Sequence, residues 1–220
     1  MTINKKNKPH TYQQTTKYLL ASVLASVIIL AFTTAPAYAA IQNHPPYTNC
    51  FKFTGGSPND RSACNTAAGN DYVYAQPGGG YDGQTYARVV KALPVTLYAG
   101  NVVTLSDISA NVKGSLYVVP TTGIKANIKV MAYLSKLSDG GTAVQNKFAT
   151  LLSKEITTGS WSTNQLYTAT SVTYTIPTTG TYYVVAYAEN YAKGSLSNSH
   201  FHNFDGSGNG ITNFKIKATY

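Results

Sequence analysis

Residues 200–210, "HFHNFDGSGNG", hold the side chains best suited to bind a metal ion in this sequence. Asp205, Ser207 and Asn209 alternate before a glycine, so their oxygens can meet on one side of a tight loop. Ca²⁺ prefers roughly six to eight oxygen ligands, whereas this loop offers one carboxylate. Ile216 also stands where an EF-hand would carry its final glutamate. Two interpretations stay open: a weak extracellular calcium site completed by other oxygens, or, as we favour, a glycine-rich turn.

His200 and His202 form a second candidate metal site, because residues two apart on a strand share a face and can chelate zinc or copper. A stable site needs further ligands, and after residue 39 the sequence holds only one other histidine, His44, far away along the chain. The favoured alternative is a pair of loop histidines that flank Phe201 and Phe204, whose rings anchor the turn to the core.

Aromatic side chains are candidates for binding a sugar, because an aromatic ring offers a flat apolar surface on which a sugar ring can stack. Tyr183, Tyr187 and Tyr191 would share one face of a strand over residues 181–191. Trp161, the one tryptophan, is a further candidate. The alternative, which we favour, is that these rings pack in the core or against neighbouring strands.

Sequence motifs of known catalytic centres are absent: there is no Gly-x-Ser-x-Gly, no His-Glu-x-x-His and no phosphate-binding glycine loop before a helix. The eight carboxylates are scattered without a close pair. The glycine-rich residues 76–84, "QPGGGYDGQ", carry no lysine and are typical of a flexible loop. We therefore do not expect an enzyme, and a secreted hydrolase with an unrecognised site remains the alternative.

The first 39 residues have the layout of a bacterial signal peptide. Four lysines precede an apolar run over residues 18–32, and Ala37-Tyr38-Ala39 has the small-x-small pattern of a cleavage site after Ala39. The run has 15 residues, fewer than the about 20 that span a membrane, so an uncleaved anchor is the less favoured alternative. Residues 40–220 would then be secreted or periplasmic, with no membrane span.

The secreted chain would carry 13 basic and 8 acidic residues, a net charge of +5. The basic residues are scattered rather than gathered on a groove or helix, which argues against nucleic-acid binding. This mild excess fits an anionic cell wall or polysaccharide equally well.

Cys50 and Cys64 are the only cysteines, and export would place them in an oxidising compartment. We predict a disulfide between them within an N-terminal extension over residues 40–83. On the chain-entropy model it would stabilise the fold by about 3 kcal/mol. A reactive free thiol is less favoured, since no histidine lies nearby.

Alternating hydrophobicity predicts an antiparallel β-sandwich of the jelly-roll type over residues 84–220. The clearest strand covers residues 124–134, where apolar residues from Ile124 to Leu134 alternate with Lys125, Lys129 and other polar residues. The last strand, over 213–220, repeats this pattern. Residues 142–156 are compatible with a helix or with a loop and a strand. The further strands are predicted at 84–90, 94–98, 101–105, 115–119, 171–176 and 181–189.

Two segments repeat each other 57 residues apart, "YVVPTTG" at 117–123 and "YTIPTTG" at 174–180. Equivalent hairpins or chance similarity could explain the repeat. It also bears on the tyrosines: Glu189 beside Tyr183 and Tyr187 indicates an exposed row, whereas the repeat aligns these tyrosines with inward residues. The sequence leaves the exposed face of residues 181–191 undecided.

The segments "VTLYAGNVVTL" (95–105) and "YTIPTTGTYYVVAYAEN" (174–190) resemble bacterial extracellular jelly rolls. They are similar to pre-peptidase C-terminal domains and to related carbohydrate-binding-like sandwiches. The resemblance covers about half of the chain after residue 39, and it implies a sandwich fold with an extracellular binding or packing role.

Together these features predict a secreted, non-catalytic surface or matrix protein that binds a polysaccharide or a cell-surface protein. The alternative is a self-associating subunit of an extracellular filament or biofilm matrix. In that case the polar segment "AIQNHPPYTNCFKF" (40–53) would lend a strand to a neighbouring copy. Calcium is the one candidate cofactor.

Overall fold

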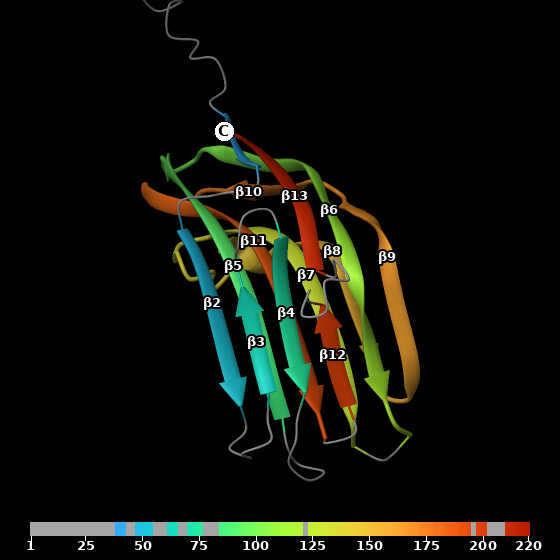
Figure 1. Ribbon diagram of the computed structural model, residues 1–220. Coiled ribbons are helices and arrows are strands. Elements are labelled where there is room, and N and C mark those ends of the chain that lie inside the picture. The colour runs from blue at the N-terminus through green and yellow to red at the C-terminus, as the bar shows by residue number, and fades with distance from the viewer. Residues whose placement is uncertain are drawn as a thin grey trace, which may run out of the picture. The chain divides into compact units, whose positions relative to one another are not determined.

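The chain forms two antiparallel sheets that pack face to face, as the computed structural model shows (Figure 1). It describes residues 38–42, 47–54, 61–65, 70–76, 84–120, 123–194, 197–201 and 210–220. Residues Tyr38–Tyr220 pack as one unit. The predicted all-β antiparallel sandwich is confirmed. No helix in this described part of the chain is long and apolar enough to cross a membrane.

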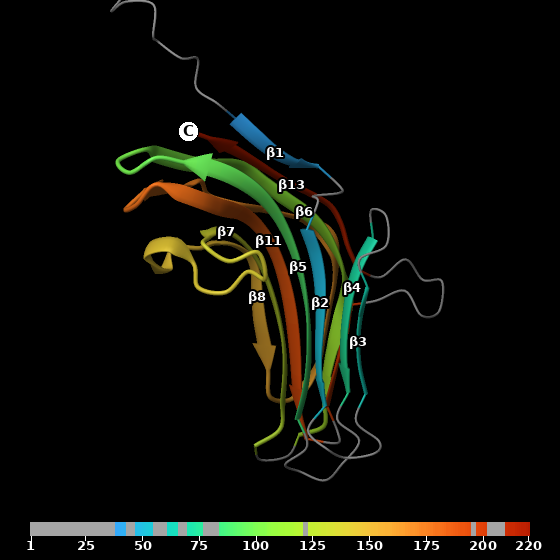
Figure 2. The ribbon, with the colours of Figure 1, turned by 90° about the vertical axis from the view of Figure 1, so that its left-hand side faces the viewer.

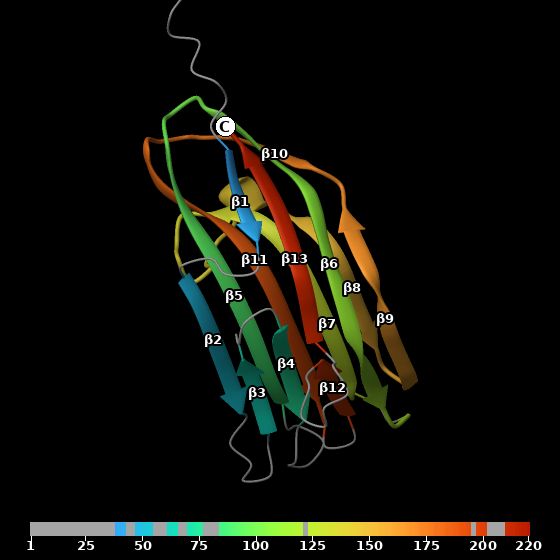
Figure 3. The same ribbon diagram turned by 45° about the horizontal axis from the view of Figure 1, so that its top comes forward.

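Sheet A has eight strands, and its longest strand, β6, lies next to the edge that β9 and β10 form (Figure 3). On one side β6 pairs with β9 and β10, and on the other with β12 and β13. The strands of sheet A are β1 (Tyr38–Gln42), β3 (Arg61–Asn65), β4 (Asn70–Gln76), β6 (Val102–Val118), β9 (Gly159–Ala169), β10 (Val172–Thr175), β12 (Ser197–Phe201) and β13 (Gly210–Thr219).

Sheet B has five strands in the order β2-β5-β11-β7-β8, with β11 in the middle. Its strands are β2 (Tyr47–Thr54), β5 (Gln84–Leu97), β7 (Lys125–Ser135), β8 (Ala149–Ile156) and β11 (Gly180–Lys193). The segment predicted as an N-terminal extension, residues 40–83, thus supplies strands to both sheets. Residues 1–37 of the predicted signal peptide lie outside the described residues.

The hydrophobic core lies between the two sheets and is built from alternate residues of each strand. In β7 Ile128 and Val130 are fully buried whereas Lys129 between them is exposed. In β13 Ile216 is buried between the exposed Lys215 and Lys217. The inward and outward faces predicted for these two strands are confirmed, because period-two patterns translate directly into the two faces of a sheet.

Two pairs of predicted strands are each one continuous strand. β5 runs through Pro94, which lies beyond Ala92, the last residue of β5 that pairs with β2. The proline nitrogen can therefore face the open side of β5 without removing a ladder hydrogen bond. β6 runs through Asp107, whose φ of 50° belongs to a β-bulge where the register with β13 shifts.

Of the two interpretations left open for residues 142–156, the helix is wrong and the loop followed by a strand is correct. Only the 3₁₀ turn η2 (Val144–Asn146) is helical, and β8 follows it. A bulge opposite Val130 and Met131 leaves both Leu151 and Leu152 buried. Two adjacent buried leucines break the alternation of a strand, which explains the misleading helical spacing.

The repeated "PTTG" segments do not form equivalent hairpins, which corrects that interpretation. The first connects β6 of sheet A to β7 of sheet B, and the second connects β10 of sheet A to β11 of sheet B. Their tyrosines also differ, since Tyr117 is 47% exposed whereas Tyr174 is fully buried. Both segments are crossings between sheets, and their Pro and Gly mark the end of strand pairing.

Candidate functional site

The outer face of sheet B, which points away from sheet A, is divided into a covered half and an open half. Residues 136–148, which link β7 to β8, lie on the covered half, on the side toward which β5 and β11 bend (Figure 2). Tyr133 donates a hydrogen bond of 2.6 Å to the Gly140 carbonyl and packs edge-on against Phe148. The apolar residues buried there are Val90, Ala92, Tyr133, Ala143, Val185 and Tyr187.

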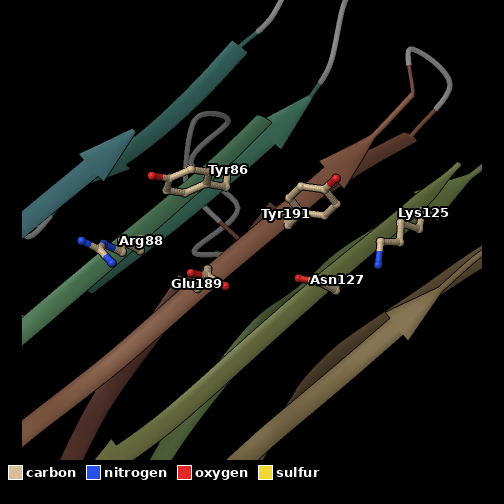
Figure 4. A pocket seen from close by; sticks show the side chains of 6 residues that line it. All are labelled: Tyr86, Arg88, Lys125, Asn127, Glu189 and Tyr191. Atoms are coloured by element: carbon tan, nitrogen blue, oxygen red, sulfur yellow. The ribbon is translucent and has the colours of Figure 1, made fainter. Parts of the chain in front are cut away.

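The open half of this face contains a hollow of about 360 Å³ (Figure 4). Its aromatic residues are Tyr86 on β5 and Tyr191 on β11, which are direct cross-strand partners. Two tyrosines on neighbouring strands therefore line the hollow among charged and amide groups, with their rings extending in opposite directions (Figure 4). The residues that line the hollow are Tyr86, Arg88, Lys125, Asn127, Glu189 and Tyr191.

Lys125 and Glu155 fix one wall of the hollow. The Lys125 Nζ lies 3.0 Å from the Glu155 Oε2, and the Asn127 Nδ2 donates to the same oxygen at 3.5 Å. The hydrogen bond from Lys125 lowers the pKa of Glu155, so this carboxylate stays ionised at neutral pH. The Asn127 Oδ1 is buried and accepts no hydrogen bond from the described residues.

Tyr191 is held in place by polar contacts at both its ring and its hydroxyl. Its hydroxyl donates to the Gln84 Oε1 at 3.0 Å, and the Lys125 Nζ lies 5.7 Å from the ring centroid. The ring is half-buried, so part of it stays accessible. A ring that is already oriented loses little conformational entropy when a ligand stacks on it.

Tyr187 and Glu189 connect the covered half to the hollow. The Tyr187 hydroxyl donates a hydrogen bond to the Glu189 Oε2. Burial of the ring, followed by the nearby Glu189 charge, raises the pKa of Tyr187 well above its usual value. Tyr187 therefore stays protonated and positions the Glu189 carboxylate at the edge of the hollow.

The structure brings together only part of the predicted aromatic site. Tyr183, Tyr187 and Tyr191 share the outer face of sheet B, whereas Tyr182 points into the core. Glu189 therefore indicated the correct face for these tyrosines and the repeat indicated the wrong one, but the row is not exposed as a whole: Tyr187 is buried and Tyr183 is partly buried, as the packing alternative predicts. Only Tyr191 lines the hollow, because Tyr187 is buried and Tyr183 packs against the covered half.

Trp161 lies on β9 of sheet A and belongs to a different surface. Its ring packs partly against the core, 6.4 Å from the ring of Phe201, with the Lys154 Nζ 6.0 Å away. It is therefore not part of the hollow on sheet B.

Sequence reasoning missed Tyr86, Arg88, Lys125 and Asn127 as site residues. Alternation along β5 and β7 places each of them on an outer face. What the sequence does not give is the register that sets Tyr86 opposite Tyr191, which is fixed by pairing between segments 105 residues apart.

The predicted metal sites are mostly beyond what the structure describes. Four of the predicted ligands lie outside the described residues: His202, Asp205, Ser207 and Asn209. His200 lies on strand β12. Within the described residues no group of three or more His, Cys, Asp or Glu side chains gathers. The calcium and transition-metal sites stay predictions.

The two cysteines lie on strands of opposite sheets. Cys50 is on β2 of sheet B and Cys64 is on β3 of sheet A. The disulfide stays a prediction, and it would join the two sheets near one edge.

No protein-family model matches this sequence, and a comparison with curated proteins finds no match. Among solved structures the chain is similar to a cleaved adhesin domain of Lys-gingipain from Porphyromonas gingivalis. The identity is 12% and the TM-score 0.28, over 82% of this chain and 99% of that one.

The chain is also similar to two carbohydrate-binding domains. For the CBM22-1 xylan-binding domain from Paenibacillus barcinonensis, the identity is 6% and the TM-score 0.23, over 85% of this chain and 97% of that one. For the mannan-recognising module TmCBM27, the identity is 12% and the TM-score 0.22, over 84% and 98%. The predicted resemblance to extracellular carbohydrate-binding-like sandwiches thus recurs weakly. Scores this low carry no argument about function, which must come from the hollow itself.

Proposed function

We propose that this protein is an exported, non-catalytic binding module that holds a polysaccharide on the open half of the outer face of sheet B. The observation that carries this proposal is the pair of cross-strand partners Tyr86 and Tyr191, which both line an open hollow (Figure 4). A sugar ring has an apolar face and a polar edge, so it can stack on an aromatic ring while its hydroxyls bond to polar neighbours. Arg88 and Glu189 supply such neighbours on the same strands.

Binding to polysaccharides tests the proposal directly. The protein would be measured on a panel of soluble and insoluble polysaccharides, together with its Tyr86→Ala and Tyr191→Ala variants. We expect each substitution to weaken binding by about tenfold or more, since a lost contact of about 1.4 kcal/mol is a factor of ten. The matched control is Tyr117→Ala, which removes a 47% exposed ring from the outer face of sheet A.

If the Tyr86→Ala and Tyr191→Ala variants bind as tightly as the wild type, the hollow is not the binding site. If the wild-type protein binds no polysaccharide, the proposed function is rejected. The same mixtures are assayed for new reducing ends. Release above the level of buffer would show that the protein is a hydrolase rather than a binding module.

Export is part of the proposal, because the layout of residues 1–39 supports a cleaved signal peptide. We expect the protein recovered outside the cytoplasm to begin at Ala40. Intact-mass measurement would identify its first residue, and a chain that keeps residues 1–39 would contradict cleavage.

A second candidate function is self-association into an extracellular assembly, and the edge strand β9 favours it. Among the described residues β9 pairs only with β6, so its other edge is open. Its 11 residues, "GSWSTNQLYTA", contain no charge and no proline, which are the usual protections of an exposed edge. Two copies can therefore meet edge to edge without charge repulsion, in an antiparallel, isologous pairing.

The predicted donor segment is used within its own chain at both ends, since Ala40–Gln42 pairs with β13 and Tyr47–Phe53 with β5. Self-association is therefore tested at β9, by light scattering and electron microscopy. Leu166→Lys places a charge at the 59% exposed centre of this edge and should abolish assembly. Tyr98→Lys, at a 63% exposed position directly after β5 of sheet B, should leave it intact. A wild-type protein that stays monomeric at all concentrations would reject this candidate.

A further inference from the structure

Two lysines lie directly opposite each other at one end of the hollow. Lys193 on β11 and Lys125 on β7 are cross-strand partners, and both belong to the outward positions of their strands. Like charges directly opposite in an antiparallel pair destabilise a sheet. Glu155 makes an ion pair with Lys125. Its carboxylate therefore does not balance the charge of Lys193.

The next rows of the same face add to this positive excess. Arg88, Glu189 and Lys129 are neighbours in one cross-strand row on β5, β11 and β7. The described rows that form and border the hollow thus carry four cations, Arg88, Lys125, Lys129 and Lys193, against two anions, Glu155 and Glu189. Ionised groups this close act within a Debye length of about 10 Å, so an approaching ligand meets a positive surface.

We propose that the ligand of the hollow is an acidic polysaccharide, with an anionic group between Lys125 and Lys193 and a sugar ring against Tyr191. This inference rests on the proposed polysaccharide binding and names its chemical class. The Lys125 Nζ lies 5.7 Å from the Tyr191 ring centroid, so a ring stacked there brings its carboxylate or sulfate within reach of the lysines. A bound anion also relieves the repulsion between the two lysines.

The test compares polysaccharides that differ only in charge. Titration calorimetry would use polygalacturonate against its methyl ester and dextran sulfate against dextran, which separates carboxylate from sulfate as the recognised group. We expect the charged member of at least one pair to bind about tenfold more tightly. This preference should shrink when the salt concentration rises from about 0.05 M to about 0.5 M.

Matched lysine variants separate a site from general attraction. Lys193→Gln should remove most of the preference for the charged polymer, whereas Lys217→Gln, an exposed lysine on the outer face of sheet A, should leave it unchanged. An equal loss in both variants would attribute the preference to net charge and overturn the inference.

Two further outcomes distinguish this inference from the proposed function. Equal, Tyr191-dependent binding of charged and neutral polymers would overturn the acidic ligand and leave polysaccharide binding in place. If the protein binds none of the four polymers and none of the polysaccharides in the broader panel, both proposals are overturned.

Discussion

Tyr174 shows what a single buried hydroxyl does in this fold. Its ring is fully buried, and its hydroxyl donates to the Lys147 carbonyl at 3.0 Å and accepts from the Leu134 N–H at 3.2 Å. One side chain of β10 thereby joins β7 to the segment before β8. Burial raises the pKa of Tyr174 to about 12, so the hydroxyl stays protonated and keeps donating at neutral pH.

We expect Tyr174→Phe to lower the free energy of unfolding by about 1–3 kcal/mol, because two backbone groups lose their partner away from water. Urea denaturation measures the loss. Tyr98→Phe is the control, since Tyr98 is 63% exposed and should change stability by no more than about 0.5 kcal/mol. Equal stability of the Tyr174→Phe variant would contradict the bridging role.

At the scale of elements, the segment over residues 136–148 decides which half of sheet B stays open. Gly140 anchors it, with φ at 72° and its Cα so close to β5 that an added Cβ would lie 2.8 Å from the Val90 Cγ1. The same atom would lie 2.9 Å from the Tyr133 hydroxyl. A side chain at this position therefore pushes the segment away from the sheet.

We expect Gly140→Ala to destabilise the protein by about 1–2 kcal/mol for the left-handed backbone, and by about 1–3 kcal/mol more for overpacking. Gly159→Ala is matched to it, since Gly159 has φ at 74° and nothing within 4 Å of the added Cβ. Thermal unfolding of the two variants isolates the packing contribution. Equal melting temperatures would show that the contact with Val90 and Tyr133 is unimportant.

At the scale of the whole molecule, buried tyrosines make stability depend on alkaline pH. Burial raises the pKa values of Tyr133, Tyr174 and Tyr187 above the value of about 10 that a tyrosine has in the unfolded chain. Above that pH the unfolded chain releases protons that the folded protein keeps. The stability that these groups contribute is therefore fully present below about pH 10 and is lost as the pH rises further.

We expect the free energy of unfolding to fall by about 1.4 kcal/mol per pH unit for each such tyrosine above about pH 10. For Tyr174 the fall continues to about pH 12. Urea midpoints between about pH 9 and about pH 11 measure the slope. The Tyr174→Phe variant should show a shallower slope, and an unchanged slope would assign the effect to other groups.

Alternation along the chain is enough to predict the fold class and the faces of the most regular strands. Residues 124–134 and 213–220 alternate without a break, and a period of two has only one structural meaning where one face of a sheet is buried. The sequence failed where bulges interrupt that period, at Asp107 and at Leu151–Leu152. A bulge depends on the partner strand, so a single segment does not reveal it.

The candidate site depends on strand register and on a covering segment, neither of which alternation reveals. Strand register places Tyr86 opposite Tyr191, and Lys125 opposite Lys193. This register is set by pairing between segments that are far apart in the sequence. The sequence placed Tyr183, Tyr187 and Tyr191 on one face, but the segment over residues 136–148 covers that face around Tyr187 and leaves Tyr191 open. Alternation gives the face of a residue, whereas register and covering segments give its neighbours and its exposure.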